Sequence, residues 1–231
     1  MTKNIIITGT SRGLGLELAR LFIKEDFTVI GCSRSPGVIT NSNYYHYCLD
    51  LSDEKLVKEM FLDIRKNHSD ILALINNAGI SHSNYILTSS GDEIQKVLKS
   101  NVIGVHFVTR EALKLMQKGG RVVFLSSFHT QLNTMGTAFY SGSKAFIEEY
   151  MKVASKEVIE PNTTFNTIAL SYVEGVGMSE KFSLEQRKKI IAGSGFQKNV
   201  TTQDVFFTLN FILSQNSHAM TGQVITLGGT V

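Results

Sequence analysis

The segment from Lys3 to Lys24 constrains the fold more than any other part of the sequence. A short apolar, β-branched run is followed by a turn that contains Gly9, Gly13 and Gly15, and then by an amphipathic pattern. A buried strand, a tight turn and a helix in this order form the first unit of a doubly wound α/β fold. The glycines let the backbone approach a ligand closely, and the helix N-terminus favours an anion such as a pyrophosphate. The segment therefore predicts a dinucleotide-binding site.

The rest of the chain alternates between strand and helix patterns without a repeat or a low-complexity tract. We expect further strands at residues 28–32, 44–48, 71–76, 121–126, 164–170 and 223–227. We expect helices at residues 53–67, 91–116, 138–159 and 202–214. Such an alternation is typical of a parallel sheet whose crossover helices cover both faces. The sequence predicts a single Rossmann-fold domain, residues 1–231, of the α/β class.

Composition agrees with one globular domain of this kind. The chain has 231 residues, 42% of them apolar, and no uninterrupted apolar run of about 18 residues that would indicate a membrane span. A strand pattern starts at once, so we expect no signal peptide, no membrane partner and a cytoplasmic location. The net charge of +3 is small and the lysines are dispersed, so we expect no nucleic-acid partner.

A second informative feature lies in the helix predicted to begin near residue 138. Tyr140 and Lys144 are four residues apart, which places them on one face of a helix, and Ser127 precedes Tyr140 by thirteen residues. A phenol titrates near about 10, and an adjacent ammonium group stabilises the phenolate and lowers that pKa. The pair predicts a proton-transfer site in which Ser127 adds a neutral hydrogen bond. Taken alone, the pair also fits a solvent-exposed helix face.

The cysteines and histidines do not predict a metal site. Cys32 and Cys48 are the only cysteines, and neither lies in a C-x-x-C or a metal-type spacing. We expect both thiols to be buried or half-buried in a reducing compartment. The six histidines are scattered. His129 follows Ser127 closely and could line a substrate cleft, although a loop histidine without a chemical role is the simpler interpretation.

Together these motifs resemble those of the short-chain dehydrogenase/reductase family, and the resemblance covers nearly the whole chain. Thr8-Gly-Thr-Ser-Arg-Gly-Leu-Gly15 is similar to the T-G-x-x-x-G-x-G turn of that family, and Asn76-Asn-Ala-Gly79 is similar to its N-N-A-G motif. Four residues match the family's catalytic tetrad in order and spacing: Asn101, Ser127, Tyr140 and Lys144.

The resemblance implies an enzyme that interconverts a carbonyl and a secondary alcohol with a nicotinamide cofactor. It implies that Ser127 holds the carbonyl oxygen and that Tyr140 gives this oxygen a proton as hydride arrives. Lys144 would bind the nicotinamide ribose and lower the pKa of Tyr140, while Asn101 would anchor a water that relays protons to Lys144. General acid catalysis of this kind contributes about 10²–10⁴-fold.

Charge at the end of the second predicted strand favours NADP(H) as the cofactor. An NAD-specific enzyme usually has an acidic residue there, but this chain has Ser33 followed by Arg34, and Arg12 adds a second guanidinium from the glycine turn. Two arginines can form charge-assisted bonds with a 2′-phosphate. The alternative is that Arg34 points to solvent and serves both cofactors.

One segment departs from the family pattern. After the sixth strand the family usually shows Pro-Gly and then a threonine that contacts the nicotinamide amide, but this chain has Leu170, Ser171 and, near the threonine position, Gly175. Val173 could still offer backbone groups to the carboxamide, and residues 173–194 correspond to the substrate lid of relatives.

By resemblance, Asp50 should hold the adenine edge. The full set of expected cofactor contacts is Gly9, Ser11, Arg12, Gly13, Leu14, Gly15, Ser33, Arg34, Asp50, Leu51, Asn76, Ala78, Gly79, Tyr140, Lys144 and Val173.

The sequence leaves three functions open. The first is an NADPH-dependent carbonyl reductase similar to the 3-oxoacyl-carrier-protein reductases in its length and in its ending, Thr221-Gly-Gln-Val-Ile-Thr-Leu-Gly-Gly229. The second is a reductase or dehydrogenase of a sugar or secondary metabolite, and the third is a catalytically silent NADP-binding regulator. The tetrad argues against the third, because a protein without catalysis has no physical need for Lys144 beside Tyr140. The expected partner is a small-molecule carbonyl or alcohol.

We also expect a homo-oligomer, a homotetramer or a homodimer. The helices predicted at 91–116 and after Tyr140 carry more apolar positions than one sheet-facing stripe requires. In relatives these two helices pack against their symmetry mates, and a two-fold contact uses the same patch on each subunit. The alternative is that the extra apolar residues thicken the core.

Overall fold

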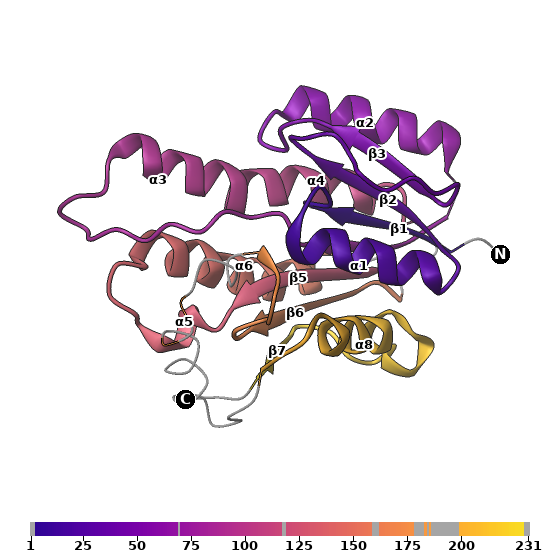
Figure 1. Ribbon diagram of the computed structural model, residues 1–231. Helices are drawn as coiled ribbons and strands as arrows, with labels where there is room; N and C mark the ends of the chain where they lie inside the picture. Colours follow the sequence, from indigo (N-terminus) through magenta and orange to yellow (C-terminus); the bar gives the residue numbers. More distant parts are fainter. Residues whose placement is uncertain are drawn as a thin grey trace.

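The computed structural model describes residues 3–68, 70–116, 119–158, 162–177, 183, 185 and 199–228. Its centre is a seven-stranded sheet with the strand order β3-β2-β1-β4-β5-β6-β7, and neighbouring strands pair in parallel (Figure 1). The strands are β1 (Lys3–Thr8), β2 (Phe27–Ser33), β3 (Tyr44–Cys48), β4 (Ile71–Asn76), β5 (Arg121–Ser127), β6 (Thr164–Leu170) and β7 (Gln223–Leu227). The helices are α1 (Gly13–Lys24), α2 (Glu54–Asn67), α3 (Gly91–Leu98), the π-helix η1 (Lys99–Ile103), α4 (Gly104–Leu113), α5 (His129–Leu132), α6 (Ala138–Glu157), α8 (Thr202–Leu213) and the 3-10 helix η3 (Gln215–Ser217).

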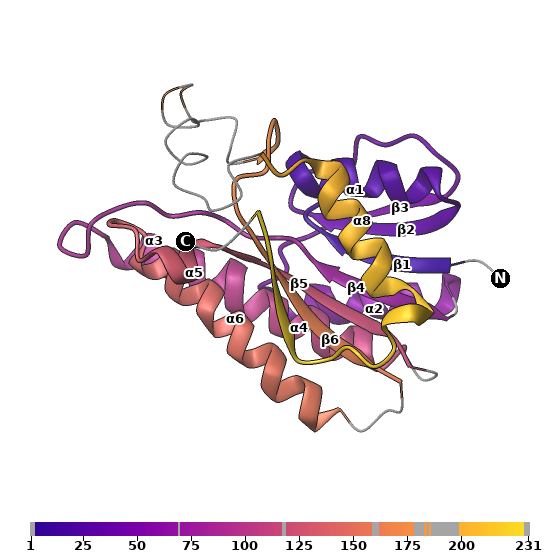
Figure 2. The ribbon, with the colours of Figure 1, turned by 90° about the horizontal axis from the view of Figure 1, so that it is seen from below.

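Helices cover both faces of the sheet because successive side chains of a strand point to opposite faces. Ile5 and Ile7 of β1 pack with α1 and α8, whereas Ile6 packs with α2, α4 and α6. Figure 2 shows α1 and α8 on one side of the sheet and α4 and α6 on the other. The predicted doubly wound α/β fold is therefore confirmed.

Two helices begin at capping boxes, which satisfy backbone N–H groups that have no partner inside the helix. At the start of α3, Ser90 Oγ accepts from Glu93 N, and the Glu93 carboxylate accepts from Ser90 N. Thr201 and Asp204 make the same reciprocal pair at the start of α8.

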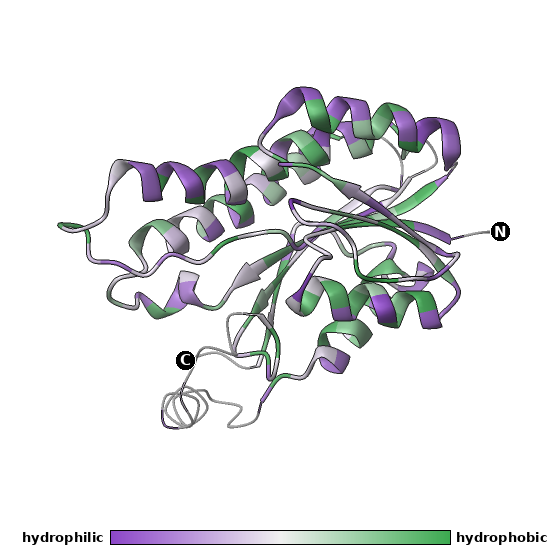
Figure 3. Ribbon diagram, turned by 45° about the horizontal axis from the view of Figure 1, so that its top comes forward, coloured by the Kyte–Doolittle hydropathy of each residue, from purple (hydrophilic) through white to green (hydrophobic). Residues whose placement is uncertain are grey.

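In the described part of the chain, the helices carry hydrophobic residues on one side and hydrophilic ones on the other (Figure 3).

The single helix predicted at 91–116 is wrong in two respects. The segment is divided into α3, η1 and α4, and it ends at Leu113. The interruption lies at Asn101, whose Oδ1 accepts from Ile80 N at 2.8 Å and whose Nδ2 donates to Ile80 O at 2.9 Å. A π-type turn widens a helix by one residue, and such turns often occur at functional sites. The helix predicted at 138–159 is α6, which ends at Glu157; residue 159 lies outside the described residues.

Among the described residues, no helix combines the length and the apolar character that crossing a bilayer requires.

Candidate active site

The glycine turn folds tightly between β1 and α1. Gly9 and Gly13 have φ angles of 78° and 60°, a left-handed region that favours glycine. Gly15 has no space for a side chain, because an added Cβ would lie 2.3 Å from Gly9 O and 2.4 Å from Asn77 Nδ2. The glycines therefore let the turn between β1 and α1 close tightly, and Gly15 packs directly against Gly9 and Asn77.

The N-N-A-G segment after β4 holds the glycine turn in place. Asn77 Nδ2 donates to Thr8 O at 2.8 Å. Thr8 Oγ1 accepts from the backbone N–H groups of Asn77 and Ala78 at 3.0 and 2.8 Å. Sequence reasoning did not assign Asn77 or Thr8 to the site, although both lie inside the two motifs.

Asn76 is placed differently from its neighbours. Its side chain is buried, and its Nδ2 donates to Thr109 Oγ1 of α4 at 3.0 Å. The structure therefore brings Ala78 and Gly79 toward the tetrad and the turn but directs the Asn76 side chain into the core.

Replacing Gly15 with alanine is expected to lower the free energy of unfolding by about 1–3 kcal/mol, because the new Cβ overlaps Gly9 O and only a shift of the turn relieves this overlap. Gly142 on α6 is the matched control, since an added Cβ there meets nothing within 4 Å. Gly142→Ala should raise stability by about 0.4–1 kcal/mol through the unfolded chain. Denaturant unfolding measures both, and an unchanged midpoint for Gly15→Ala would contradict the close packing.

A hollow lies beside the start of α1. Arg12 occupies the N-cap position of α1, where its side chain is exposed and makes no capping hydrogen bond. Ser11 and Leu14 are half-buried on the same turn. The hollow is lined by Arg12, Gly13, Leu16, Glu17, Gly175, Val176 and Thr202. A positive helix end beside an arginine is a setting that favours a phosphate group.

The ends of β2 and β3 form the neighbouring edge of this region. Ser33 is buried, and its Oγ donates to Ser35 O at 2.7 Å, whereas Arg34 is exposed. Asp50 is exposed as well, and its carboxylate accepts from the N–H and hydroxyl of Ser52, both at 2.9 Å. Leu51 packs closely on α4, where a Cβ added to Gly104 would lie 3.1 Å from Leu51 Cβ.

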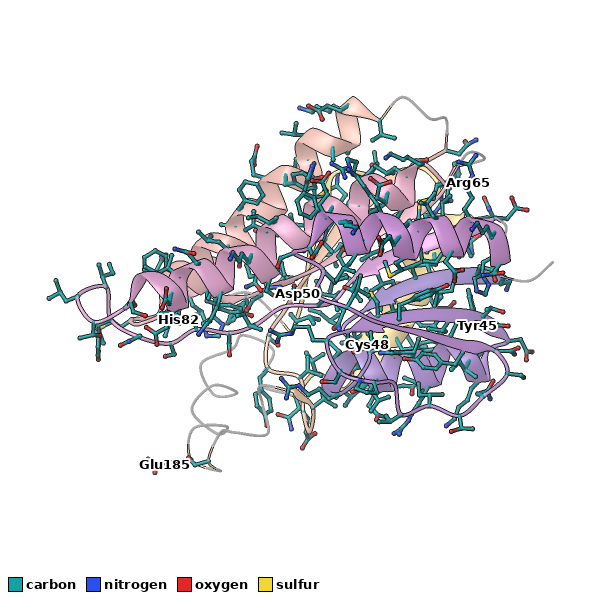
Figure 4. The ribbon with its side chains drawn as sticks, turned by 90° about the horizontal axis from the view of Figure 1, so that it is seen from above. Tyr45, Cys48, Asp50, Arg65, His82 and Glu185 are labelled. Carbon is teal, nitrogen blue, oxygen red and sulfur yellow. The ribbon has the colours of Figure 1, made fainter. Side chains whose placement is uncertain are left out.

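The two cysteines differ in their exposure. Cys32 is buried, and burial raises the pKa of its thiol to about 12. The expectation that both thiols are at least half-buried is wrong for Cys48, which is exposed and whose Sγ donates to Arg34 O at 3.3 Å. Figure 4 shows Cys48 and Asp50 at the carboxyl end of β3. The thiol is exposed because β3 is an edge strand of the sheet.

The four tetrad residues come together at the carboxyl ends of β4 and β5. Ser127 ends β5, Tyr140 and Lys144 lie on α6, and Asn101 lies on η1; all four side chains are buried. Tyr140 and Ser127 share a hydrogen bond. Lys144 Nζ donates to Leu125 O at 2.8 Å. A Cβ added to Gly79 would lie 3.2 Å from Asn101 Oδ1 and 3.4 Å from Lys144 Nζ, so these two side chains flank the same point.

Burial controls the protonation of Tyr140 and Lys144. It raises the pKa of Tyr140, and the hydrogen bond with Ser127 opposes this rise. It lowers the pKa of Lys144 to about 8, while the charge of Glu148 raises it. Here the Lys144 ammonium donates to Leu125 O and burial dominates the pKa of Tyr140, so the expected lowering of that pKa by Lys144 stays a prediction.

The sequence comparison decides the family. The family model described as short chain dehydrogenase matches residues 3–187 of this chain. The chain belongs to the short chain dehydrogenase family.

Several known proteins are similar to this chain over almost their whole length. The 3-oxoacyl-[acyl-carrier-protein] reductase FabG of Buchnera aphidicola subsp. Schizaphis graminum is 28% identical, with 98% of this chain and 96% of that protein covered. Carbonyl reductase family member 4 of Xenopus laevis is 27% identical, with 99% and 98% covered. The solved structure "ElxO with NADP Bound" has a TM-score of 0.88 at 28% identity, and it covers 98% of this chain and 97% of its own.

In this short chain dehydrogenase, two further side chains adjoin the tetrad. His129 Nδ1 lies 3.1 Å from Ser127 Oγ, and its ring packs edge-to-face on Tyr140 with centroids 5.8 Å apart. Burial lowers the pKa of His129, which favours the neutral imidazole. The structure thus places His129 at the site, on the short helix α5 that the sequence did not predict.

Sequence reasoning missed Glu148, which lies one helical turn after Lys144 on α6. Its Oε1 accepts from Ser126 Oγ at 2.6 Å and from Thr130 Oγ1 at 3.2 Å. The Glu148 carboxylate therefore connects α6 to a residue that precedes Ser127 in the sequence and to a residue that follows it. The four-residue spacing from Lys144 was the signal that could have identified it.

The unusual residues after β6 have a structural explanation. Leu170 continues β6 and pairs with both Ser127 and Leu227, and Ser171 N donates to Leu227 O at 3.0 Å.

Val173 forms a parallel bridge with Val200. Glu174 N donates to Val200 O, and Val200 N donates to Tyr172 O. Because the flanking residues make these bonds, the N–H and C=O of Val173 itself point to the other edge. Most of the expected lid at 173–194 lies outside the described residues.

Proposed function

We propose that this chain is an NADPH-dependent reductase that interconverts a carbonyl and a secondary alcohol, with residues 1–231 acting as one catalytic domain. The observation that carries the proposal is the group of buried tetrad side chains beside the glycine turn. A buried lysine is costly to charge, and a lysine pKa shifted by burial in this way is typical of a functional site. This cost also disfavours a catalytically silent NADP-binding regulator.

The dinucleotide fits the residues present. The left-handed Gly9 and Gly13 shape the turn before α1, and the N–H groups at the N-terminus of α1 would bind the pyrophosphate. The N–H and C=O of Val173 would hold the carboxamide, and Lys144 would hold the nicotinamide ribose. When bound, NADPH would supply the hydride.

The chain's own residues would then bind and protonate the substrate. Ser127 would donate a hydrogen bond to the carbonyl oxygen, and Tyr140 would donate its phenolic proton to the same oxygen. Lys144, with a pKa of about 8, carries a positive charge at neutral pH and would stabilise the phenolate that remains. Asn101 fixes the main chain at Ile80 beside the site, and its expected role with a relay water stays a proposal.

The charged residues near the end of β2 and the similarity to two solved structures favour NADPH over NADH. Ser33 stands where a carboxylate would repel a 2′-phosphate, and Arg12 and Arg34 are exposed at the same edge of the fold. Two similar solved structures, 28% and 27% identical, are described as ElxO with NADP bound and as a single-residue variant of ElxO with NADPH bound. Asp50 is our candidate for the adenine edge.

For the substrate, we favour a small 3-oxoacyl thioester over a sugar or a secondary metabolite. Support comes from the similarity to 3-oxoacyl-[acyl-carrier-protein] reductases over 98% of this chain. The altered segment at Leu170 and Ser171 leaves the second class open. The expected cytoplasmic location stays a prediction from the sequence.

A carbonyl panel tests the proposal. The absorbance of the reduced nicotinamide would be followed with acyl thioesters, free ketones, sugars and secondary-metabolite ketones, with Tyr140→Phe as the inactive control. Consumption of NADPH with at least one carbonyl supports the proposed reductase activity. A preference for acyl thioesters over the other carbonyls supports a 3-oxoacyl thioester as the substrate. NADPH binding without consumption on any carbonyl would instead favour the regulator.

We also propose a homo-oligomer built on α3, η1 and α6, which contact one another. Large apolar side chains remain exposed on these helices: Leu98 (40%), Ile103 (40%), Phe146 (48%) and Val153 (46%).

Light scattering at micromolar concentration is expected to give the mass of a dimer or a tetramer. Phe146→Asp should shift the mass toward the monomer, because a charge in an apolar contact is costly. Phe207→Asp on α8, where Phe207 is also exposed to solvent, is the control that should not; a monomeric wild type would refute the proposal.

A further inference from the structure

A chain of hydrogen bonds connects the glycine turn to the loop after β2. Thr10 lies in the turn, and its Oγ1 is 2.9 Å from the Tyr44 hydroxyl. That hydroxyl lies 2.7 Å from His46 Nδ1. On the other side of the ring, His46 Nε2 lies 2.9 Å from Ser35 O and 3.2 Å from Ser33 Oγ.

The acceptors in this network determine which nitrogen of His46 carries the proton. Ser35 O is a carbonyl and can only accept, so Nε2 carries a hydrogen and donates to it. The Tyr44 hydroxyl donates to Thr10 Oγ1 and lies within hydrogen-bond distance of His46 Nδ1, so it links the glycine turn to the imidazole. Each polar group has a partner, so the network holds one geometry.

Two glycines make room for this network. A Cβ at Gly31 would lie 2.3 Å from Thr10 Oγ1 and 2.5 Å from the Tyr44 hydroxyl. A Cβ at Gly37 would lie 2.7 Å from His46 Cγ. The loop from Ser33 to Gly37 therefore wraps directly around the imidazole.

The network joins the two segments that carry the arginines. Arg12 is two residues from Thr10, and Arg34 lies between Ser33 and Ser35. The backbone of Arg34 is also held from β3, because Cys48 Sγ donates to Arg34 O at 3.3 Å. Arg34 thus lies between two residues that bond to His46, and Arg12 lies two residues after the Thr10 side chain that the same network reaches.

We propose that His46 is a positioning residue for the 2′-phosphate of NADPH, because it holds the Arg34 loop against the Arg12 turn. The proposal rests on the proposed function, since it assumes that NADPH is the cofactor. His46 does not contact the phosphate; it acts through the two arginines. Its loss should therefore affect the cofactor that has the 2′-phosphate and spare the one that lacks it.

The test is a pair of titrations, NADPH and NADH, on the purified wild type and on His46→Ala. We expect NADPH to bind about tenfold more weakly to His46→Ala, as for one misaligned charge-assisted bond, and NADH affinity to stay within about twofold. In turnover, the KM for NADPH should rise while kcat at saturating NADPH is kept. His46→Gln should restore most of the affinity, because its amide N–H can reach Ser35 O.

Two further variants keep the test decisive. Tyr44→Phe keeps the ring in the core and removes the hydroxyl that bonds to His46, so it should lose part of the NADPH preference even if His46→Ala does not fold. His218→Ala is the control, because His218 is exposed and bonds to a backbone carbonyl at Gln215, far along the chain from either arginine.

The outcomes separate this inference from the proposed function. A wild type without preference for NADPH would refute the cofactor assignment. A wild type that prefers NADPH, with the same affinity ratio in His46→Ala and Tyr44→Phe, would overturn the role of His46. An equal loss for NADH and NADPH would also overturn it, because it would mean that His46 only supports the fold.

Discussion

Replacing Tyr140 with phenylalanine is expected to lower turnover by about 10²-fold or more while NADPH affinity stays unchanged. The substitution removes the proton donor and keeps the ring, which is buried and packs on His129. The phenol hydroxyl is assigned to the substrate oxygen and not to the pyrophosphate, so cofactor binding should not depend on it. Steady-state rates on any active substrate, with NADPH titration in parallel, measure the two effects.

Tyr150→Phe is the matched control for this experiment. Tyr150 lies on the same helix, α6, and its hydroxyl bonds to His106 Nδ1 at 3.1 Å, away from the tetrad. Its loss should leave kcat within about twofold, as for a hydroxyl that takes no part in proton transfer. Full activity in Tyr140→Phe would mean that the tyrosine is an ordinary buried residue, and the tetrad assignment would have to be withdrawn.

The second large effect is expected from the two arginines. The double variant Arg12→Ala, Arg34→Asp should bind NADPH about 10²-fold more weakly, given about 1.5–3 kcal/mol for each hydrogen bond to a charged group. NADH affinity should stay the same or rise, because the new carboxylate can accept from the ribose hydroxyls. Titration of the wild type and the double variant with both cofactors gives the ratio of the dissociation constants for NADPH and NADH, and a change in this ratio tests the prediction.

Arg65→Ala serves as the control for the loss of a positive charge. Arg65 is exposed in the last turn of α2, far from the glycine turn (Figure 4), so its loss should leave both affinities within about twofold, as for an exposed charge. Equal affinity of the wild type for NADPH and NADH would contradict the electrostatic argument, whatever the variants do.

The sheet was predictable because its strands are short runs rich in β-branched, aromatic and other apolar residues. β3, β4, β6 and β7 have the predicted bounds, and β1 coincides with the apolar run that opens the chain. The four tetrad residues were identified through the resemblance to a family motif. The structure brings them together from the end of β5, from one face of α6 and, for Asn101, from η1.

The features that the sequence did not predict depend on contacts between distant segments. The break at η1 follows from bonds between Asn101 and Ile80, which no helical periodicity encodes. The raised pKa of Tyr140 and the lowered pKa of Lys144 follow from burial, which a spacing of four residues does not reveal. The network at His46 requires the pairing of β2 with β3 and the turn after β1 in addition.

The bridge between Val173 and Val200 has a consequence for how such an enzyme can diversify. The chain leaves the sheet region at Val173 and returns at Val200 on backbone that is already paired, beside the glycine turn. Both ends of the intervening segment are thus held by backbone hydrogen bonds, which do not depend on the identity of the side chains. Substitutions between the two ends can therefore change the sequence beside the site while β6 keeps its register and the tetrad keeps its position.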